Sequence, residues 1–284
     1  MLDVKRLRLL SELARRGTIA AVARTVGYTP SAVSQSLAQL EREAGVALLE
    51  RDGRRVRLTP AARALVRRAD RILQELDAAE AALAAEHETV KGALVIGAFP
   101  SAATALVVPA VRQLAVRHPE LGCTIREHEP EEGIPLLRAG ELDLLVSESY
   151  DGVADAPAGG LERHPLLSEP LLLVLPDGPA PADLDALPWI GGLAGTQYAA
   201  ALQLACRAAG LQPRFAHRAD EASVHVALVA AGLGIGLLPA LACTPAPGVR
   251  FTEFEHAPRR HVFALARRGA ARRPTVAAAL EAMR

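Results

Sequence analysis

Uncharged hydrogen-bonding side chains repeat along one face of a predicted helix near the start of the chain. In the segment TPSAVSQSLAQLE, Thr29 is a good N-cap and Pro30 occupies the first helical position. Val33, Leu37 and Leu40 form an apolar stripe at helical spacing. The polar face can hydrogen-bond to base edges and phosphates, and an ordinary solvated surface is the alternative. The predicted contacts are Thr29, Ser31, Ser34, Gln35 and Gln39.

A basic hairpin is predicted directly after this helix. The segment VALLERDGRRVRLT indicates two strands around an Asp52-Gly53 turn. Arg51, Arg54 and Arg55 lie near its tip, where their charges could hold a phosphate backbone. Helix, turn, helix and hairpin together predict a winged helix-turn-helix that binds double-stranded DNA.

Residues that could carry other chemistry are sparse. The chain has no Gly-x-Ser-x-Gly elbow, P-loop, dinucleotide fingerprint or metal-spaced histidine pair, so we expect neither an enzyme nor a cofactor or metal. The three cysteines, Cys123, Cys206 and Cys243, are widely spaced and are expected to be structural. A thiol-based redox-sensing regulator that uses Cys206 or Cys243 is the alternative.

Composition and charge support a protein with a basic end. The 284 residues are enough for about two domains, and 50% of them are hydrophobic. No signal peptide or long apolar run is evident, so we expect a cytoplasmic protein without membrane contact. Residues 1–58 hold eleven Lys or Arg against six Asp or Glu, whereas the remainder holds 21 against 26. This asymmetry suggests that the N-terminal part meets a polyanion.

Several helices must position the polar face and connect it to the rest of the chain. A first helix is expected from Val4 to Ala14, ended by Gly17, and Thr18 can cap a second short helix. A long helix is expected to open at Pro60, with apolar residues at alternating steps of four and three that form the seam of a coiled coil. Packing onto its own domain is the alternative. The predicted dimer contacts are Leu65, Ile72, Leu76 and Leu83.

Strands and helices alternate after Gly92, which predicts an α/β arrangement. One set contains ALVIGA, CTIREHE and LDLLVSE, and a second set contains LLLVLP, FAHRA and GIGLLP. Strand ends that lead into helix starts are where ligands bind in open α/β sheets. Ser101 and Thr196 occupy such positions in the two sets, although each could simply cap its helix.

These segments together resemble the LysR-type transcriptional regulator family over essentially the whole chain. The most specific part is ELARRGTIAAVARTVGYTPSAVSQSLAQLEREAGVALLERDGRRVRLTPAARAL, and GALVIGAFPS and VAAGLGIGLLP resemble sensor-domain signatures. Pro30 departs from the glutamine common in the family, so the base contact of that side chain is not expected here. Leu48-Leu49 and Ala62 are smaller departures.

The resemblance implies an α+β multidomain protein with a winged helix-turn-helix over residues 1–58, a dimerising linker helix over 59–91 and a two-lobed α/β domain over 92–284. That last domain would resemble periplasmic binding proteins, with lobe I at about 92–163 and 251–284, lobe II at about 164–250, and crossover strands near Leu161–Leu167 and Val249–Glu255. A solute-binding module fused to a DNA-binding head is a less favoured interpretation.

The implied function is sequence-specific regulation of transcription, controlled by a small-molecule effector between the lobes. The paired helix starts favour an anionic or strongly polar effector group. The other implied partners are DNA, a second or further copies in a homodimer or homotetramer, and RNA polymerase. The candidate effector-binding residues are Phe99, Ser101, Glu148, Thr196, Gln197 and Ser223.

Overall fold

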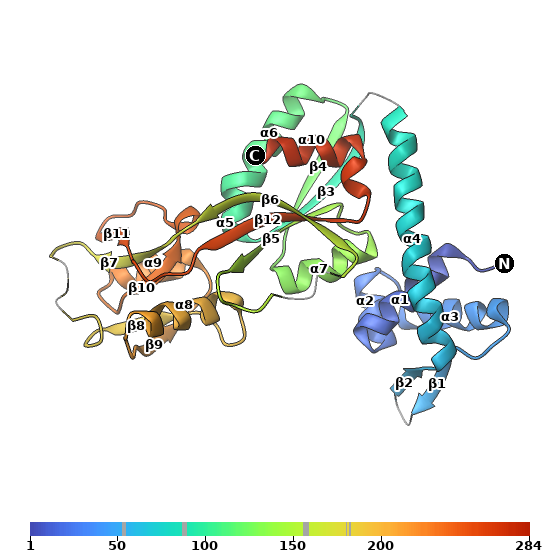
Figure 1. Ribbon diagram of the computed structural model, residues 1–284, viewed down its shortest axis with the longest axis horizontal. Coiled ribbons are helices and arrows are strands. Elements are labelled where there is room, and N and C mark those ends of the chain that lie inside the picture. The colour runs from blue at the N-terminus through green and yellow to red at the C-terminus, as the bar shows by residue number, and fades with distance from the viewer. Residues whose placement is uncertain (53–54, 87–89, 156–158, 180, 182) are drawn as a thin grey trace.

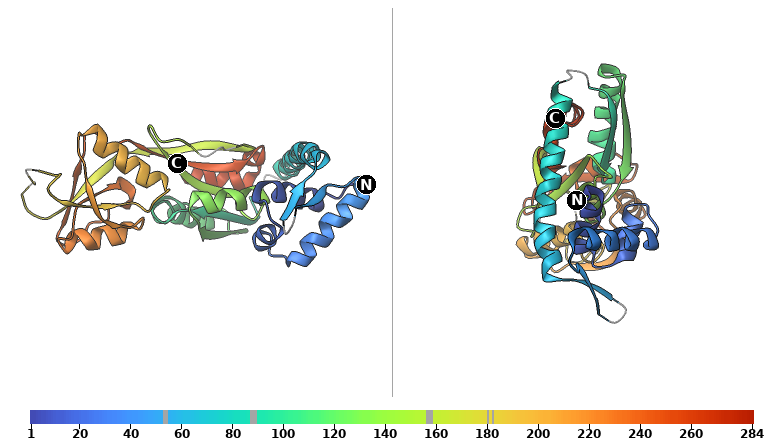
Figure 2. Two further views of the ribbon diagram at one scale, coloured as in Figure 1. Left: turned by 90° about the horizontal axis from the view of Figure 1, so that it is seen from below. Right: turned by 90° about the vertical axis from the view of Figure 1, so that its right-hand side faces the viewer.

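The computed structural model describes residues 1–52, 55–86, 90–155, 159–179, 181 and 183–284. A small helical head and a long helix lie at one end, and two α/β lobes extend away from them (Figure 1). The views in Figure 2 show that the lobes follow one another along the long axis of the molecule. Among the described helices, none has both the length and the apolar character needed to cross a membrane.

The head is a winged helix-turn-helix, as the sequence predicts. Local signals end and begin its helices: Gly17 adopts φ 74° after the first helix, and Thr18 accepts a hydrogen bond from the Ala21 amide at the start of the second. Apolar side chains from all three helices form one buried core. The elements are α1 (Val4–Arg16), α2 (Ile19–Thr25), α3 (Pro30–Ala44), β1 (Leu49–Asp52) and β2 (Arg55–Leu58).

The long helix α4 (Pro60–Glu86) connects the head to the first lobe. Thr59 caps it, since its hydroxyl accepts a hydrogen bond from the Ala62 amide. The helix contacts α1 near its start and a short turn, η3 (Ala270–Arg272), of the first lobe farther along. The helix α4 therefore packs against both the head and lobe I.

Lobe I is built on a five-stranded sheet in the order β4-β3-β5-β12-β6. The pairs of β3 with β4 and β5 are parallel, and β12 runs antiparallel to β5 and β6. Helices cover the sheet (Figure 1), and an apolar core lies between the sheet and these helices. The elements are β3 (Gly92–Ala98), α5 (Pro100–Ala102), η1 (Ala103–Val107), α6 (Val108–Arg117), β4 (Leu121–Glu127), α7 (Pro130–Ala139), β5 (Leu144–Tyr150), β6 (Leu161–Glu169), β12 (Arg260–Arg267) and α10 (Pro274–Ala282).

Lobe II contains a three-stranded sheet, β10-β7-β11, and a parallel pair, β8-β9. Its core includes the single tryptophan, Trp189, which is fully buried. The elements are β7 (Leu171–Pro176), β8 (Pro188–Gly191), α8 (Gln197–Ala208), β9 (Arg214–Arg218), α9 (Ala222–Ala230), β10 (Gly236–Pro239), η2 (Ala240–Ala242) and β11 (Val249–Glu253). Of these strands, β8 was not expected from the sequence.

The lobes are joined at two crossings that differ somewhat from those expected. The first passes from β6 to β7 near Pro170, so residues 164–169 belong to the first sheet rather than to lobe II. The second passes from β11 to β12, so residues 251–253 remain in lobe II. The observed crossings thus lie several residues after the expected lobe boundaries. The sequence pattern of a strand is the same whichever lobe contains it, so the pattern alone does not locate a crossing.

Candidate functional site

The polar face of α3 is exposed at its centre. Val33, Leu37 and Leu40 are buried in the head, which directs Ser34 and Gln35 toward solvent. Ser31 is exposed near the start of the helix, where the Thr29 hydroxyl accepts a hydrogen bond from the Ala32 amide. Gln39 differs, because its amide interacts with Arg42 and Glu43 on the same helix. Ser31, Ser34 and Gln35 are the side chains open to a ligand.

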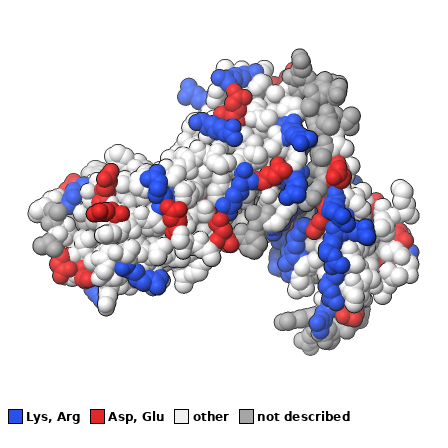
Figure 3. Space-filling view, in the orientation of Figure 1, with Lys and Arg blue, Asp and Glu red and all other residues white. Residues whose placement is uncertain are grey.

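The hairpin pairs Leu49 with Leu58 and Asp52 with Arg55, so its register lies one residue later than a turn at Asp52-Gly53 would give. Arg54 lies outside the described residues, as do the side chains of Arg51 and Arg55. Lys and Arg gather over the head and the adjoining part of α4 in the space-filling view (Figure 3). Four exposed arginines lie in the first turns of α4: Arg63, Arg67, Arg68 and Arg71. They were not among the predicted DNA contacts, although their helical spacing is visible in the sequence.

The apolar seam of α4 is divided between two environments. Leu65 and Ala69 pack into the core of the head, as in the alternative interpretation of this helix. Ile72 and Leu76 leave that core and are 44% and 38% exposed. The side chain of Leu83 lies outside the described residues. Only the middle of the seam is thus shown to be available to another surface.

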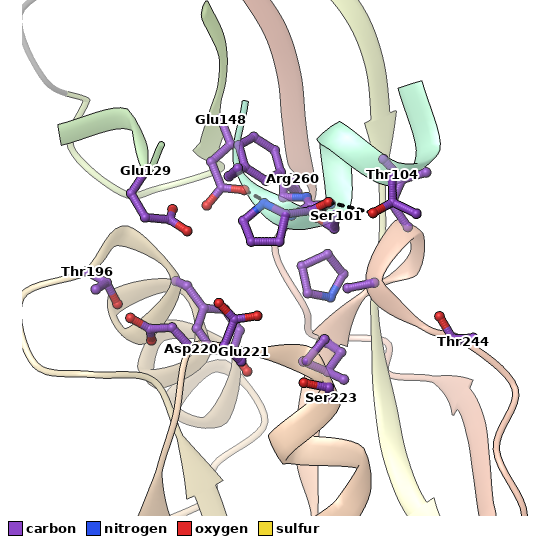
Figure 4. A pocket seen from close by; sticks show the side chains of 18 of the residues that line it. Ser101, Thr104, Glu129, Glu148, Thr196, Asp220, Glu221, Ser223, Thr244 and Arg260 are labelled. Carbon is purple, nitrogen blue, oxygen red and sulfur yellow. Dashed lines mark hydrogen bonds and ion pairs between the residues drawn. The ribbon is translucent and has the colours of Figure 1, made fainter. Parts of the chain in front are cut away.

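A cavity of about 560 Å³ lies between the two lobes. Residues far apart in sequence form its walls, including β3–α5 and β5 from lobe I and the starts of α8 and α9 from lobe II. Figure 4 shows their side chains converging on this space. All six predicted effector-binding residues line it: Phe99, Ser101, Glu148, Thr196, Gln197 and Ser223.

Arg260, which the sequence analysis missed, organises the lobe I wall. Its guanidinium is 3% exposed and lies 2.9 Å from a Glu148 oxygen and 2.5 Å from a Glu169 oxygen. It also donates a 3.3 Å hydrogen bond to the Ser101 hydroxyl and lies over the Phe99 ring. Burial disfavours the charged form of Arg260 and would lower its pKa. The negative charges of Glu148 and Glu169 together have a larger effect in the opposite direction, so the pKa of Arg260 is raised.

The same cluster connects the lobes. The second oxygen of Glu169 accepts a 2.6 Å hydrogen bond from the Leu241 amide in η2 of lobe II. Tyr150 donates a hydrogen bond to Glu148, on the lobe I side. Burial raises the pKa of the Glu148 carboxyl, although the adjacent Arg260 opposes this. Arg260 and its two carboxylates therefore form a buried network at the base of the cleft.

Thr196 has a local structural role. Its hydroxyl accepts a hydrogen bond from the Ala199 amide and donates one to the Leu193 carbonyl. Thr196 is therefore the N-cap of α8, the alternative considered for it from sequence. Ser101 does not cap its helix, since the N-cap of α5 is Phe99 and the Ser101 hydroxyl accepts from Arg260.

Carboxylates from both lobes surround the mouth of the cleft. Glu129 and Glu131 lie at the start of α7, opposite Asp220 and Glu221 before α9 (Figure 4 labels all but Glu131). Partial burial, followed by repulsion from Glu148 and the other three, raises the pKa of Glu129 to about 7. Of the two kinds of effector group expected from the sequence, anionic or strongly polar, this lining favours the second, because an added anion would meet like charge.

The thiols lie in apolar surroundings. Cys206 is buried within α8, and burial, aided by Asp185, raises its pKa to about 11. Burial and Glu169 raise the pKa of Cys243 to about 12, and its thiol contacts the Pro239 carbonyl oxygen at 3.4 Å. Cys123 has a raised pKa as well, because of burial. Among the described residues, no three His, Cys, Asp or Glu side chains are grouped to hold a metal ion.

Comparison with known proteins gives two matching family models. Residues 4–63 match the bacterial regulatory helix-turn-helix protein model of the lysR family, and residues 87–284 match the LysR substrate binding domain. A probable hydrogen peroxide-inducible genes activator of Mycobacterium leprae (strain TN) is 31% identical over 254 residues, covering 86% of this chain and 79% of the relative. Its counterpart from Mycobacterium xenopi is 34% identical over 172 residues, covering 61% and 88%.

Solved structures share the fold over the full length. A full-length OxyR variant from Pseudomonas aeruginosa has a TM-score of 0.69 at 21% identity, covering 100% of this chain and 95% of that one. CbnR, a LysR family transcriptional regulator, has a TM-score of 0.58 at 22% identity, covering 100% of both chains. CbnR complexed with target DNA has a TM-score of 0.54 at 21% identity, again covering 100% of both.

Proposed function

This chain belongs to the LysR family of bacterial transcriptional regulators, and we propose that a small molecule in the cleft between its lobes controls how it binds DNA. The observation that carries the proposal is the cavity of about 560 Å³ lined by both lobes. A ligand that touches both walls binds one arrangement of the lobes better than another, and this difference can be transmitted to the head.

The head supplies the proposed DNA interface. Ser31, Ser34 and Gln35 would contact base edges, since they are exposed on α3 and carry both donors and acceptors. The wing arginines would contact phosphates, and the exposed arginines of α4 could extend that contact. The proposed units are the head at 1–58, the linker helix at 59–91 and the sensor domain at 92–284. A protein with this function works in the cytoplasm, where RNA polymerase is a further candidate partner.

The linker helix is proposed to pair with a second copy. Ile72 and Leu76 are the apolar seam residues that the head leaves exposed. Burying them against another α4 would remove apolar surface from water and give the two heads a fixed separation for two half-sites.

Thiol-based sensing is the second candidate, because two relatives are named as probable peroxide-inducible activators. The surroundings of the cysteines oppose it. A sensing thiol reacts as the thiolate, and the raised pKa values of Cys206 and Cys243 keep both thiols protonated near neutral pH. The cleft is therefore the better-supported sensor.

A ligand screen with the full-length chain tests the cleft. Compounds that bind only the folded protein raise its melting temperature. We expect the shift from a cleft ligand to disappear in Ser223→Trp, because this exposed residue lines the cleft and the indole would fill it. Unchanged DNA binding by that variant would show that it folds. A ligand that alters DNA binding equally in both proteins would place the sensing site elsewhere.

A further inference from the structure

The charge of the cleft lining is strongly unbalanced. Five carboxylates line it, and the one Lys or Arg among its lining residues is Arg260. Four of the carboxylates are exposed and are called the mouth carboxylates, whereas Glu148 is mostly buried beside Arg260. The five are Glu129, Glu131, Glu148, Asp220 and Glu221.

The Arg260 charge is already neutralised within the protein. Its side chain is 3% exposed and is held by both Glu148 and Glu169. A ligand carboxylate or phosphate that recruited Arg260 would have to separate it from these partners and leave them buried without a counter-charge, which is costly. Arg260 is thus not available to bind an anionic ligand.

The mouth carboxylates face each other across the gap between the lobes. Glu129 belongs to lobe I, whereas Asp220 and Glu221 belong to lobe II (Figure 4). Asp220 accepts a 2.7 Å hydrogen bond from the Leu193 amide through one oxygen, which fixes its side chain on that wall. Without a ligand, like charges on opposite walls oppose closer approach of the lobes.

The rest of the cleft is uncharged. Pro239, Leu241 and Ala242 come from the β10–η2 segment, and Pro245 follows in the same wall. In Figure 4, the hydroxyls of Thr104 and Thr244 lie on the side of the cleft away from Glu129 and Asp220. The cavity thus has an acidic end and an apolar end bordered by hydroxyl groups.

We propose that the cleft binds an organic cation, with its ammonium or guanidinium group between Glu129 and the Asp220–Glu221 pair and its apolar part against the Pro239–Pro245 wall. This inference rests on the proposed function, since it names the ligand class of that cleft. The cation turns repulsion between the walls into attraction, so it holds the lobes together where a neutral molecule of the same shape would not. The size and apolar end of the cavity favour an organic molecule over a bare metal ion.

The test compares molecules of one shape and different charge. Benzylamine, benzyl alcohol and benzoate are each added to the full-length chain, and melting temperature and calorimetric affinity are measured. We expect benzylamine to raise the melting temperature more than the other two. In Glu129→Gln and Glu221→Gln its affinity should fall by about tenfold each, the effect of losing one charge-assisted hydrogen bond. The matched control is Glu132→Gln, on the same helix as Glu131 but outside the lining, and it should bind like the wild type.

Two outcomes overturn the inference. If benzylamine raises the melting temperature no more than benzyl alcohol does, the cleft has no preference for a cation. If benzoate binds better and Ser223→Trp abolishes that binding, the charge assignment is wrong while the cleft remains the ligand site. The cleft itself would fail as the sensor only if an effector of DNA binding acted unchanged on Ser223→Trp, so the two failures are distinguishable.

Discussion

The head and the cleft are the regions proposed to bind DNA and a small molecule, and their polar groups are arranged in opposite ways. The head exposes uncharged side chains on α3, and Lys and Arg gather over the head and the adjoining part of α4 (Figure 3). The cleft exposes carboxylates, and its one arginine among the lining residues is buried between Glu148 and Glu169. DNA would therefore meet like charge at the cleft, and the cation proposed for the cleft would meet like charge at the head.

The difference also concerns how firmly the groups are held. Ser34 and Gln35 project from a surface helix into solvent. Arg260 is tied to Ser101, Glu148 and Glu169, and Glu169 is tied in turn to the second lobe. Changes in the head should therefore alter binding with little effect on stability, whereas changes at the base of the cleft should alter stability first.

The largest effect is expected for Arg260→Met, which leaves Glu148 and Glu169 buried without their cation. Loss of one partner from a buried ion pair costs about 3–5 kcal/mol of unfolding free energy. Fluorescence of Trp189, the single tryptophan, reports urea unfolding of lobe II. Arg259→Met is the matched control. Arg259 is the exposed neighbour of Arg260 in sequence, and among the described residues its side chain hydrogen-bonds to Ser168 alone. Equal stability of the two variants would contradict a structural role for the network.

The second effect concerns the helix between the two regions. In Leu76→Asp a charge would enter the proposed seam between two copies of α4, so we expect dissociation toward monomer at micromolar concentration. Sedimentation measures it. Arg71→Asp, which changes an exposed position on the same helix, is the comparison. A dimeric Leu76→Asp protein would assign the association to another surface.

In the head, Arg54→Ala with Arg55→Ala should weaken binding to all DNA sequences alike. Each lost phosphate contact lowers the slope of log K against log salt by about one. Gln35→Ala should instead lose about 1–3 kcal/mol at the preferred site only. Anisotropy titrations over several salt concentrations separate the two, with Arg163→Ala in the sensor domain as a control. An unchanged slope in the double variant would remove the wing from the interface.

The pH dependence of amine binding should distinguish the cleft from the head. Glu129 has a pKa of about 7 and faces Glu131, Glu148, Asp220 and Glu221. It loses its proton as pH rises through about 7, so benzylamine affinity should increase there, by up to about tenfold. The unliganded protein should respond in the opposite sense, because a raised carboxyl pKa means that stability falls as pH rises toward 7.

Calorimetry at several pH values measures the amine affinity. In Glu129→Gln the profile through this range should flatten. A wild-type profile that is already flat would mean that Glu129 does not sense the bound cation.

The smallest effect is expected from the thiols. Cys206→Ala and Cys243→Ala should leave DNA binding after peroxide treatment the same as in the wild type, because the raised pKa values suppress the thiolate. Footprinting of treated and untreated protein checks this. A peroxide response that disappears in either variant would favour redox sensing over the cleft.

The sequence predicted the head well because its determinants are local. Gly17, Thr18 and Thr29 each set a helix end within a few residues of themselves, and the structure confirms those ends. The two strands of the wing were predicted as well, although their register lies one residue later than expected. The division of the α4 seam was not predictable, since burial of Leu65 and Ala69 depends on how the head folds back onto that helix.

The cleft was predicted only in part. Strand ends identified Phe99 and Ser101, and family resemblance added Glu148 and Ser223, all of which line the cavity. Arg260 was missed because it lies 91 residues from Glu169 and 112 from Glu148. The acidic lining of the cleft was not predictable for the same reason: the carboxylates of α7 and of the segment before α9 become neighbours only when the two lobes face each other.

The most direct test of the account is whether occupation of the cleft changes DNA binding. A duplex selected by the full-length chain from a random pool is titrated with and without benzylamine, for the wild type and for Ser223→Trp. The account predicts that the amine changes the affinity or footprint of the wild type and not of Ser223→Trp. Calorimetric binding of the amine in the wild-type cleft, with DNA affinity and footprint unchanged, would contradict it.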